Sequence, residues 1–327
     1  MVAMPKPKIK KIVLLLLLVG AGTVIGATVS FFFFNDAPIL FGEVIYGVEY
    51  KENLTLDIYQ PTQPIYSKAP VIVFFHGGAW VMGRKEAINV NRFHGAINTL
   101  REQGFALISV EYSLASQGRS PFPYCIEDAF DALDWLEQNA DSHGLDMGNV
   151  GVMGESAGAQ IAMMLAYTSA KENFPRATIS PQYVVDIYGP TDLQGLYEMP
   201  LVDSLDQYLT KVPDAIRKKV DIAHYLFGFD PQADSTQTVK FAQQYSPIHH
   251  LSKNAPPTLI IHGNKDRVVP VEQSYALHQK LNDLQVDAEL HIVDGMDHAL
   301  GNATPEQKLA VQKWIVAFIE KHTSPAE

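Results

Sequence analysis

The sequence contains a single cysteine and no internal repeat or low-complexity run. One cysteine, Cys125, among 327 residues excludes an intrachain disulfide, so cysteine usage gives no evidence about the cellular compartment. Cys125 stands at the start of a predicted helix, where we expect a small buried residue rather than a reactive thiol. No group of residues has the spacing of a metal site, and we interpret His249-His250 as a loop pair rather than as ligands.

Basic residues are also scarce. Lysine and arginine number 25 against 36 aspartate and glutamate residues, which gives a formal charge of −11. Four of the lysines precede residue 12, so the rest of the chain is more acidic still. A nucleic-acid-binding protein needs a basic surface, and this composition argues against that class. The 47% hydrophobic content of the chain is sufficient for one large core.

An uncharged segment runs from Ile12 to Phe34 behind those four lysines. As a helix it would span roughly 34 Å, enough to cross a bilayer core of about 30 Å. The positive-inside rule then places the N-terminus in the cytoplasm and the rest of the chain outside it, on the periplasmic side of the inner membrane in a bacterium. We predict a cytoplasmic tail and membrane anchor in residues 1–35, with the membrane contact made by residues 12–34. A cleaved signal peptide and a secreted protein are the alternative, although the segment is long and ends in four phenylalanines.

The rest of the chain, residues 36–327, alternates between predicted strands and helices. The strands are expected at 42–50, 53–59, 71–75, 106–110, 149–153, 183–187, 258–261 and 288–292. The helices are expected at 87–102, 126–138, 159–166, 271–283 and 305–321. This alternation predicts an α/β fold with a mostly parallel central sheet flanked by helices. Residues 190–250 lack a clear strand, and we interpret them as a small helical cap inserted over the sheet.

The most informative motif is Gly154-Glu155-Ser156-Ala157-Gly158. It follows a short apolar strand and precedes an apolar helix, and this is the context of a nucleophile elbow with the pattern G-x-S-x-G. The glycines leave room for a sharp turn that exposes the serine hydroxyl above the sheet. We therefore predict that Ser156 is a nucleophile.

A serine nucleophile needs a base and an acid that orients the base. Active sites of open parallel sheets lie at the carboxyl ends of the strands, where His298 and Asp266 each follow a predicted strand. The order Ser156, Asp266, His298 is the one expected of a hydrolase with this architecture. Asp192 is the alternative acid, and Asp297 is too close in sequence to His298 to orient its ring.

Glycines after another strand predict an oxyanion hole. His76-Gly77-Gly78-Ala79-Trp80 follows the strand 71–75, and backbone amides there can approach a substrate oxygen without interference from a Cβ atom. We assign the N–H groups of Gly77, Gly78 and Ala157 to this role. His76 is expected to brace the loop.

These motifs resemble the α/β-hydrolase superfamily, specifically the carboxylesterase/lipase branch with an HGG oxyanion motif, related to hormone-sensitive-lipase-type esterases. The likeness covers roughly residues 42–322. It implies an eight-stranded sheet and a serine hydrolase without a cofactor. Two positions depart from the family pattern: Ala79 stands where a third glycine is common, and Ser113 stands where an arginine usually forms an ion pair.

The sequence thus predicts a membrane-anchored serine carboxylic ester hydrolase that acts through an acyl-enzyme on small or medium acyl esters. Its expected partners are a small-molecule ester and, through the N-terminal helix, a membrane. A serine peptidase of the same fold and a non-catalytic binding protein of hydrolase fold are the alternatives. The natural substrate and the oligomeric state do not follow from the sequence.

Overall fold

The computed structural model describes residues 42–89, 93–116, 119–168, 178–198, 226–229, 231 and 233–323. The predicted anchor within residues 1–35 lies outside these ranges, and so does the middle of the predicted cap, residues 199–225. Among the residues that the structure describes, no helix is both long and apolar enough to span a membrane.

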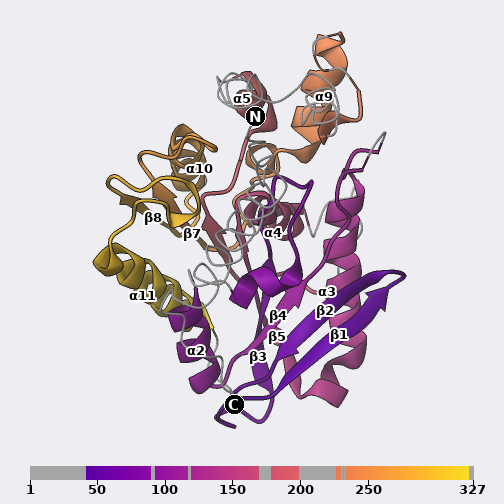
Figure 1. The fold of residues 1–327 in the computed structure, drawn as a ribbon, viewed down its shortest axis with the longest axis vertical. Coiled ribbons are helices and arrows are strands. Elements are labelled where there is room, and N and C mark those ends of the chain that lie inside the picture. Colours follow the sequence, from indigo (N-terminus) through magenta and orange to yellow (C-terminus); the bar gives the residue numbers. More distant parts are fainter. Residues whose placement is uncertain are drawn as a thin grey trace, which may run out of the picture. The chain divides into compact units, whose positions relative to one another are not determined.

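Eight strands form one sheet with the order β1-β2-β4-β3-β5-β6-β7-β8 (Figure 1). Their bounds are β1 Val44–Lys51, β2 Leu54–Tyr59, β3 Ala69–Phe75, β4 Ala106–Val110, β5 Leu145–Glu155, β6 Val184–Ile187, β7 Thr258–Gly263 and β8 Ala288–Val293. The strands β1 and β2 form an antiparallel hairpin, and β2 is antiparallel to β4. All pairings from β4 to β8 are parallel, so the predicted α/β fold with a mostly parallel sheet is confirmed.

The apolar run in β3 explains why helices cover both faces of the sheet. Val71, Val73 and Phe75 pack into one hydrophobic cluster, whereas Ile72 and Phe74 pack into a second cluster on the other face. Successive strand residues point to opposite faces, so a strand buried on both sides reads as a continuous apolar run.

The helices divide between the two faces (Figure 1). The helices α3 (Tyr124–His143) and α4 (Ala157–Thr168) pack together on the first face, and α2 (His94–Glu102) and α11 (Pro305–His322) pack together on the second. The remaining helices are η1 (Lys85–Asn89), α5 (Leu193–Glu198), α9 (Ser235–Tyr245), η2 (Pro247–His249), α10 (Glu272–Asp283) and η3 (His298–Leu300). Cys125 is fully buried in α3, as predicted, and burial raises the pKa of its thiol.

One predicted helix is shorter than expected. In place of a helix over 87–102, the structure has η1, then α2 from His94, with residues 90–92 outside the described ranges. The side chain of Asn89 donates to the hydroxyl of Tyr59 at 2.9 Å, so the end of η1 is fixed to β2.

The described parts of residues 190–250 are helical, in α5, α9 and η2. Ala242 and Tyr245 of α9 pack in the same cluster as α4. The Nε2 group of Gln160 in α4 donates to the carbonyl of Tyr245 at 2.8 Å, so this segment is fixed to the helix that follows Ser156. Its role as a cap remains a prediction.

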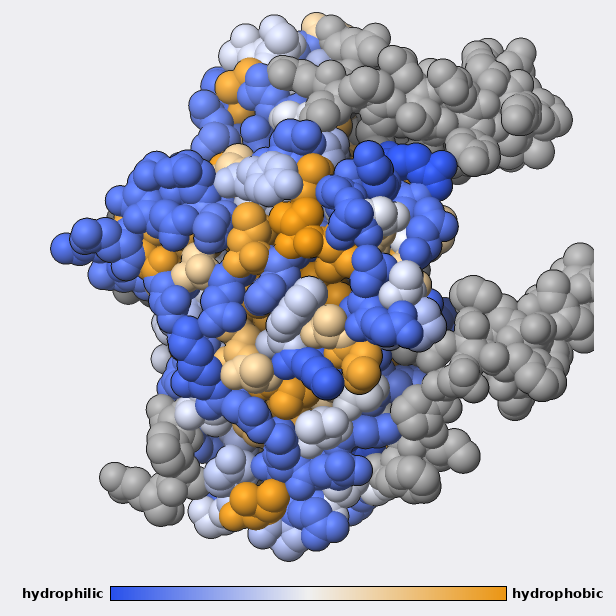
Figure 2. All heavy atoms as spheres, turned by 90° about the vertical axis from the view of Figure 1, so that its left-hand side faces the viewer, coloured by the Kyte–Doolittle hydropathy of each residue, from blue (hydrophilic) through white to orange (hydrophobic). Residues whose placement is uncertain are grey.

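The face that includes α10, β8 and α11 is mainly hydrophilic, with hydrophobic side chains gathered near its centre (Figure 2).

Candidate active site

Ser156 lies between β5 and α4 with a φ of 52°. This left-handed conformation is uncommon for a residue with a side chain and is typical of strained functional turns. The N–H of Ser156 donates to the carbonyl of Ile187 in β6 at 2.9 Å, and its own carbonyl accepts the N–H of Ala159 at 3.0 Å. The elbow is thus held by the neighbouring strand and by the first turn of α4.

Both elbow glycines are sterically required. A Cβ atom on Gly154 would lie 2.3 Å from the backbone of Gly158, and one on Gly158 would lie 2.1 Å from the carbonyl oxygen of Phe75. Because these neighbours are backbone atoms, no side-chain rotation relieves the clash. The elbow pattern predicted from the sequence is therefore the one that this packing demands.

The structure brings Ser156, His298 and Asp266 into one hydrogen-bonded chain. The Nε2 atom of His298 lies 3.0 Å from the Oγ of Ser156, and its Nδ1 lies 2.7 Å from the Oδ2 of Asp266. Asp266 follows β7, and His298 begins η3 after β8, so both lie at the carboxyl ends of strands next to each other. With Nδ1 protonated, Nε2 is free to accept the serine proton.

Asp266 is almost completely buried and fully hydrogen-bonded. Its Oδ1 accepts the N–H groups of Val268 and Val269 at 2.7 and 2.8 Å. Its Oδ2 also lies 3.2 Å from the Nε2 of His262. Burial alone would raise the pKa of Asp266, but the hydrogen bonds and charges of His262 and His298 outweigh it and hold the pKa well below its usual range. Asp266 therefore remains a carboxylate.

The two other acids considered from the sequence have different partners. The Oδ1 of Asp192 accepts the N–H of Gln194 at 3.0 Å in the first turn of α5. The Oδ1 of Asp297 accepts the backbone N–H of His298 at 2.8 Å, and its Oδ2 binds the Nε of Arg267 at 2.7 Å. Asp297 thus fixes the backbone next to the imidazole rather than the ring itself.

The loop after β3 places backbone donors at the same end of the sheet. Within the described ranges, the N–H groups of Gly77, Gly78 and Ala157 donate to no protein acceptor. Gly78 has a φ of 126°, and a Cβ there would lie 2.0 Å from the carbonyl oxygen of Met82. Ala79 adopts a φ of 52°, so an alanine occupies a conformation that favours glycine.

His76 braces this loop from beneath. Its Nδ1 donates to the carbonyl of Gly77 at 2.8 Å, and its ring stacks on Tyr112 at 4.4 Å between centroids. The hydroxyl of Tyr112 in turn donates to the carbonyl of His76 at 2.7 Å. Burial lowers the pKa of His76, which keeps the ring neutral in this role.

Sequence reasoning missed Tyr188 and the role of Glu155. Tyr188 follows β6 with a φ of 46°, and its ring packs edge-on against His298 at 4.8 Å. Its hydroxyl donates to the Oε2 of Glu155 at 2.6 Å, and Glu155 also lies against Gly77. This buried pair connects His298, the elbow and the loop after β3. Only the tertiary structure reveals it, because Tyr188 carries no motif.

At Ser113, where the family pattern has an arginine, a nearby acid is paired with a lysine of β1. The N–H of Ser113 donates to the Oδ2 of Asp128 at 2.7 Å. Lys51 of β1 forms ion pairs with both Asp128 and Asp131 at 2.6 Å. Lys51 therefore supplies a cation to the carboxylate that accepts the N–H of Ser113.

An eight-stranded sheet of this order, with a Ser-His-Asp chain at the carboxyl ends of its strands, defines an α/β-hydrolase. The chain belongs to the BD-FAE family, whose profile matches residues 56–281. The predicted resemblance to the carboxylesterase branch of the α/β-hydrolases is thereby confirmed.

Three known proteins illustrate the similarity. Esterase LipC of Mycobacterium tuberculosis is 28% identical over 73% of this chain and 54% of its own length. Ethyl acetate hydrolase of Pseudomonas putida is 26% identical over 80% of this chain and 76% of its own. The crystal structure of carboxyl esterase 2 from Tuber melanosporum has a TM-score of 0.62 and 25% identity, and covers 88% of this chain and 90% of that chain. The chain spans about half the length of several curated relatives that it matches.

Proposed function

We propose that the protein is a serine carboxylic ester hydrolase that acts on small or medium acyl esters through an acyl-enzyme. The observation that carries this proposal is the continuous chain of hydrogen bonds from Ser156 through His298 to the buried carboxylate of Asp266. The names of the relatives, which include esterases and an ethyl acetate hydrolase, support the same reaction class.

The geometry supports the following sequence of steps. The Oγ of Ser156 attacks the acyl carbon while its proton passes to the Nε2 of His298. Asp266 stabilises the resulting imidazolium, and the N–H groups of Gly77, Gly78 and Ala157 bind the oxyanion. The alcohol departs with the proton from Nε2, leaving acyl-Ser156. A water molecule then attacks the ester carbon while His298 takes its proton. The bond to Oγ breaks, Nε2 returns the proton to Ser156, and the acid is released.

The substitution Ser156→Ala tests this function. It should lower kcat on p-nitrophenyl acetate by about 10⁴-fold or more, and it should abolish labelling by a fluorophosphonate probe. Ser142→Ala is the matched control, because Ser142 lies on the exposed side of α3 away from the site. Wild-type rates in purified Ser156→Ala would show that the assignment is wrong. A flat activity profile from pH 5 to 8 would argue against a histidine base.

We also propose that residues 12–34 anchor the enzyme in a membrane, with the catalytic domain outside the cytoplasm. The support is the uncharged segment behind four lysines in the sequence. Membrane fractions of cells expressing the full chain should retain the protein after alkaline extraction. A mature protein that begins beyond about residue 28 would instead indicate a cleaved signal peptide.

A further inference from the structure

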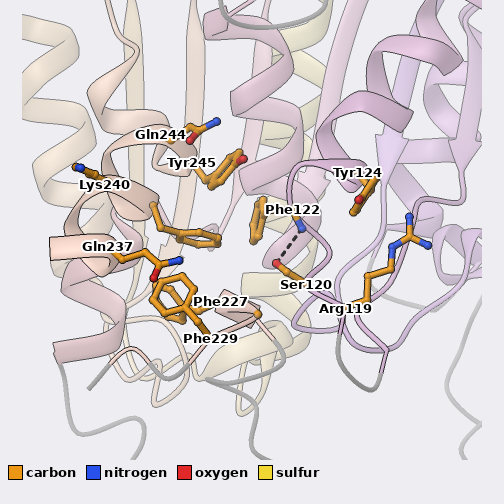
Figure 3. A pocket seen from close by; sticks show the side chains of 12 residues that line it. Arg119, Ser120, Phe122, Tyr124, Phe227, Phe229, Gln237, Lys240, Gln244 and Tyr245 are labelled. Carbon is orange, nitrogen blue, oxygen red and sulfur yellow. Dashed lines mark hydrogen bonds between the residues drawn. The ribbon is translucent and has the colours of Figure 1, made fainter. Parts of the chain in front are cut away.

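A cavity of about 490 Å³ opens between the segment that leads into α3 and the helix α9 (Figure 3). Its volume is in the range of small-molecule sites. The lining residues on α9 are Gln237, Lys240, Phe241, Gln244 and Tyr245. Their spacing of three and four residues places them on one face of the helix, so α9 presents this face to the cavity.

The floor of the cavity is aromatic. The rings of Phe122 and Tyr245 stack at 4.9 Å, and Phe241 meets Phe122 edge-on at 5.4 Å. Phe227 and Phe229 extend this floor and contact Phe241 at 4.7 and 6.1 Å. Clusters of this kind favour a flat aromatic partner, which can add a further stacked or edge-on contact.

The rim of the cavity is cationic. Among the described residues, Arg119 and Lys240 are the only charged ones in the lining, and they lie on opposite sides of Phe122 (Figure 3). The guanidinium of Arg119 lies over the ring of Tyr124 at 4.0 Å. Within the described ranges neither cation forms an ion pair, although the chain carries 36 acidic residues against 25 basic ones. With two amides and three hydroxyls in the same lining, these groups suit an anionic ligand.

The inner wall of the cavity is connected to the catalytic elbow. Phe122 packs against Trp80 of the oxyanion loop at 5.7 Å. The Nε1 of Trp80 donates to the Oε1 of Gln160 at 3.1 Å, and the N–H of Gln160 donates to the carbonyl of Ser156 at 3.2 Å. Ser156 and His298 do not line the cavity, so a group bound there is separate from the reacting atoms.

We propose that this cavity binds a flat aromatic ring that carries a carboxylate, as the part of the ester substrate remote from the scissile bond. The claim that the bound ring is part of an ester substrate rests on the proposed ester hydrolysis, whereas the claim that the cavity binds it does not. The aromatic floor holds the ring by stacking, and one of the two rim cations, Arg119 or Lys240, binds the carboxylate.

The first experiment measures binding of 2-naphthoate to the full-length protein by calorimetry at low salt. The double variant Arg119→Gln/Lys240→Gln should weaken binding by about 3- to 10-fold, since exposed ion pairs contribute little each. Raising the salt to 0.5 M should remove most of this difference. Lys253→Gln, at an exposed lysine outside the cavity, should leave binding unchanged. Neutral 2-naphthylmethanol should bind equally to all three proteins, and octanoate, which lacks a ring, should bind more weakly than 2-naphthoate.

The second experiment compares kcat/KM for the acetate esters of 4-(4-hydroxybutyl)benzoate and of the corresponding neutral benzamide. The double variant should lower kcat/KM by about 3- to 10-fold for the carboxylate ester and leave the amide ester within twofold. Equal effects on both esters would overturn the substrate role. Unchanged naphthoate binding in the double variant would overturn the binding site. In that case, hydrolysis of either ester by the wild type would leave the proposed function intact. If neither ester is hydrolysed but the variant loses naphthoate binding, the proposed function fails and the binding site stands.

Discussion

Replacement of Asp266 by asparagine should nearly abolish activity through the protonation pattern of His298. The Oδ1 of Asp266 accepts two backbone N–H groups, from Val268 and Val269. In the variant the amide oxygen must occupy this position, because an NH₂ group would face two donors. The NH₂ group is then forced to the position of Oδ2, which faces the Nδ1 of His298 at 2.7 Å.

An NH₂ group at that position requires Nδ1 of His298 to act as an acceptor. The ring proton then moves to Nε2 and points at the Oγ of Ser156, so Nε2 can no longer accept the serine proton. A triad with the wrong tautomer loses about 10⁴-fold in kcat. The Nε2 of His262 also lies near the position of Oδ2 and would face the same NH₂ group. Turning the amide over would relieve this contact but would set the NH₂ group against the two backbone N–H groups.

The assay is kcat on p-nitrophenyl acetate from pH 6 to 9, with a thermal melt to show that the variant is folded. Asp297→Asn is the matched control. Its oxygen can still accept the backbone N–H of His298, so we expect a loss of several-fold at most. A folded Asp266→Asn enzyme that keeps more than one tenth of the wild-type kcat would refute the tautomer argument. A loss in Asp297→Asn as large as in Asp266→Asn would refute the assignment of the orienting acid.

Three further perturbations test the packing around the site. Tyr188→Phe removes the donor to Glu155 and should lower the free energy of unfolding by about 1–3 kcal/mol in denaturant titrations, with a smaller loss in a Glu155→Gln background. Burial raises the pKa of Asp186 to about 7, above its unfolded value of about 4, so wild-type stability is lost as pH rises through that window. Asp186→Asn should therefore gain about 2 kcal/mol relative to wild type between pH 5 and 7, and a constant difference would contradict the shift. Gly158→Ala should abolish activity or soluble expression because its Cβ meets the carbonyl that ends β3, whereas Gly148→Ala, with only a side-chain neighbour, should be tolerated.

Patterns that repeat along the backbone predicted the fold well. The apolar run of β3 and the alternation of β1 and β2 reflect how many faces of each strand are buried. Buried positions carry apolar residues, so the sequence itself indicates them. The helix over 87–102 was the exception, because the structure has η1 and α2 in its place. The bond between Asn89 and Tyr59 joins residues distant in sequence, and no local pattern reports such a bond.

The site residues divide in the same way. Ser156, Gly77 and Gly78 could be located because a sharp turn and a close backbone approach leave few residue types that fit. Asp266 and His298 could be chosen because parallel strands end at one edge, which limits where a partner can lie. Tyr188, His262 and the aromatic cavity could not, since their positions depend on side-chain packing between elements.

The sequence by itself determined the alternation of strands and helices and the elbow with its glycines, and it left Asp266 and Asp192 as candidates for the acid beside His298. The tertiary structure alone decided that Asp266 rather than Asp192 faces His298, that Lys51 neutralises Asp128, and that α9 and the segment before α3 enclose a cationic, aromatic cavity. The physical reason is range: backbone geometry and burial act on neighbours in sequence, whereas ion pairs, ring contacts and cavities form between residues that only folding brings together.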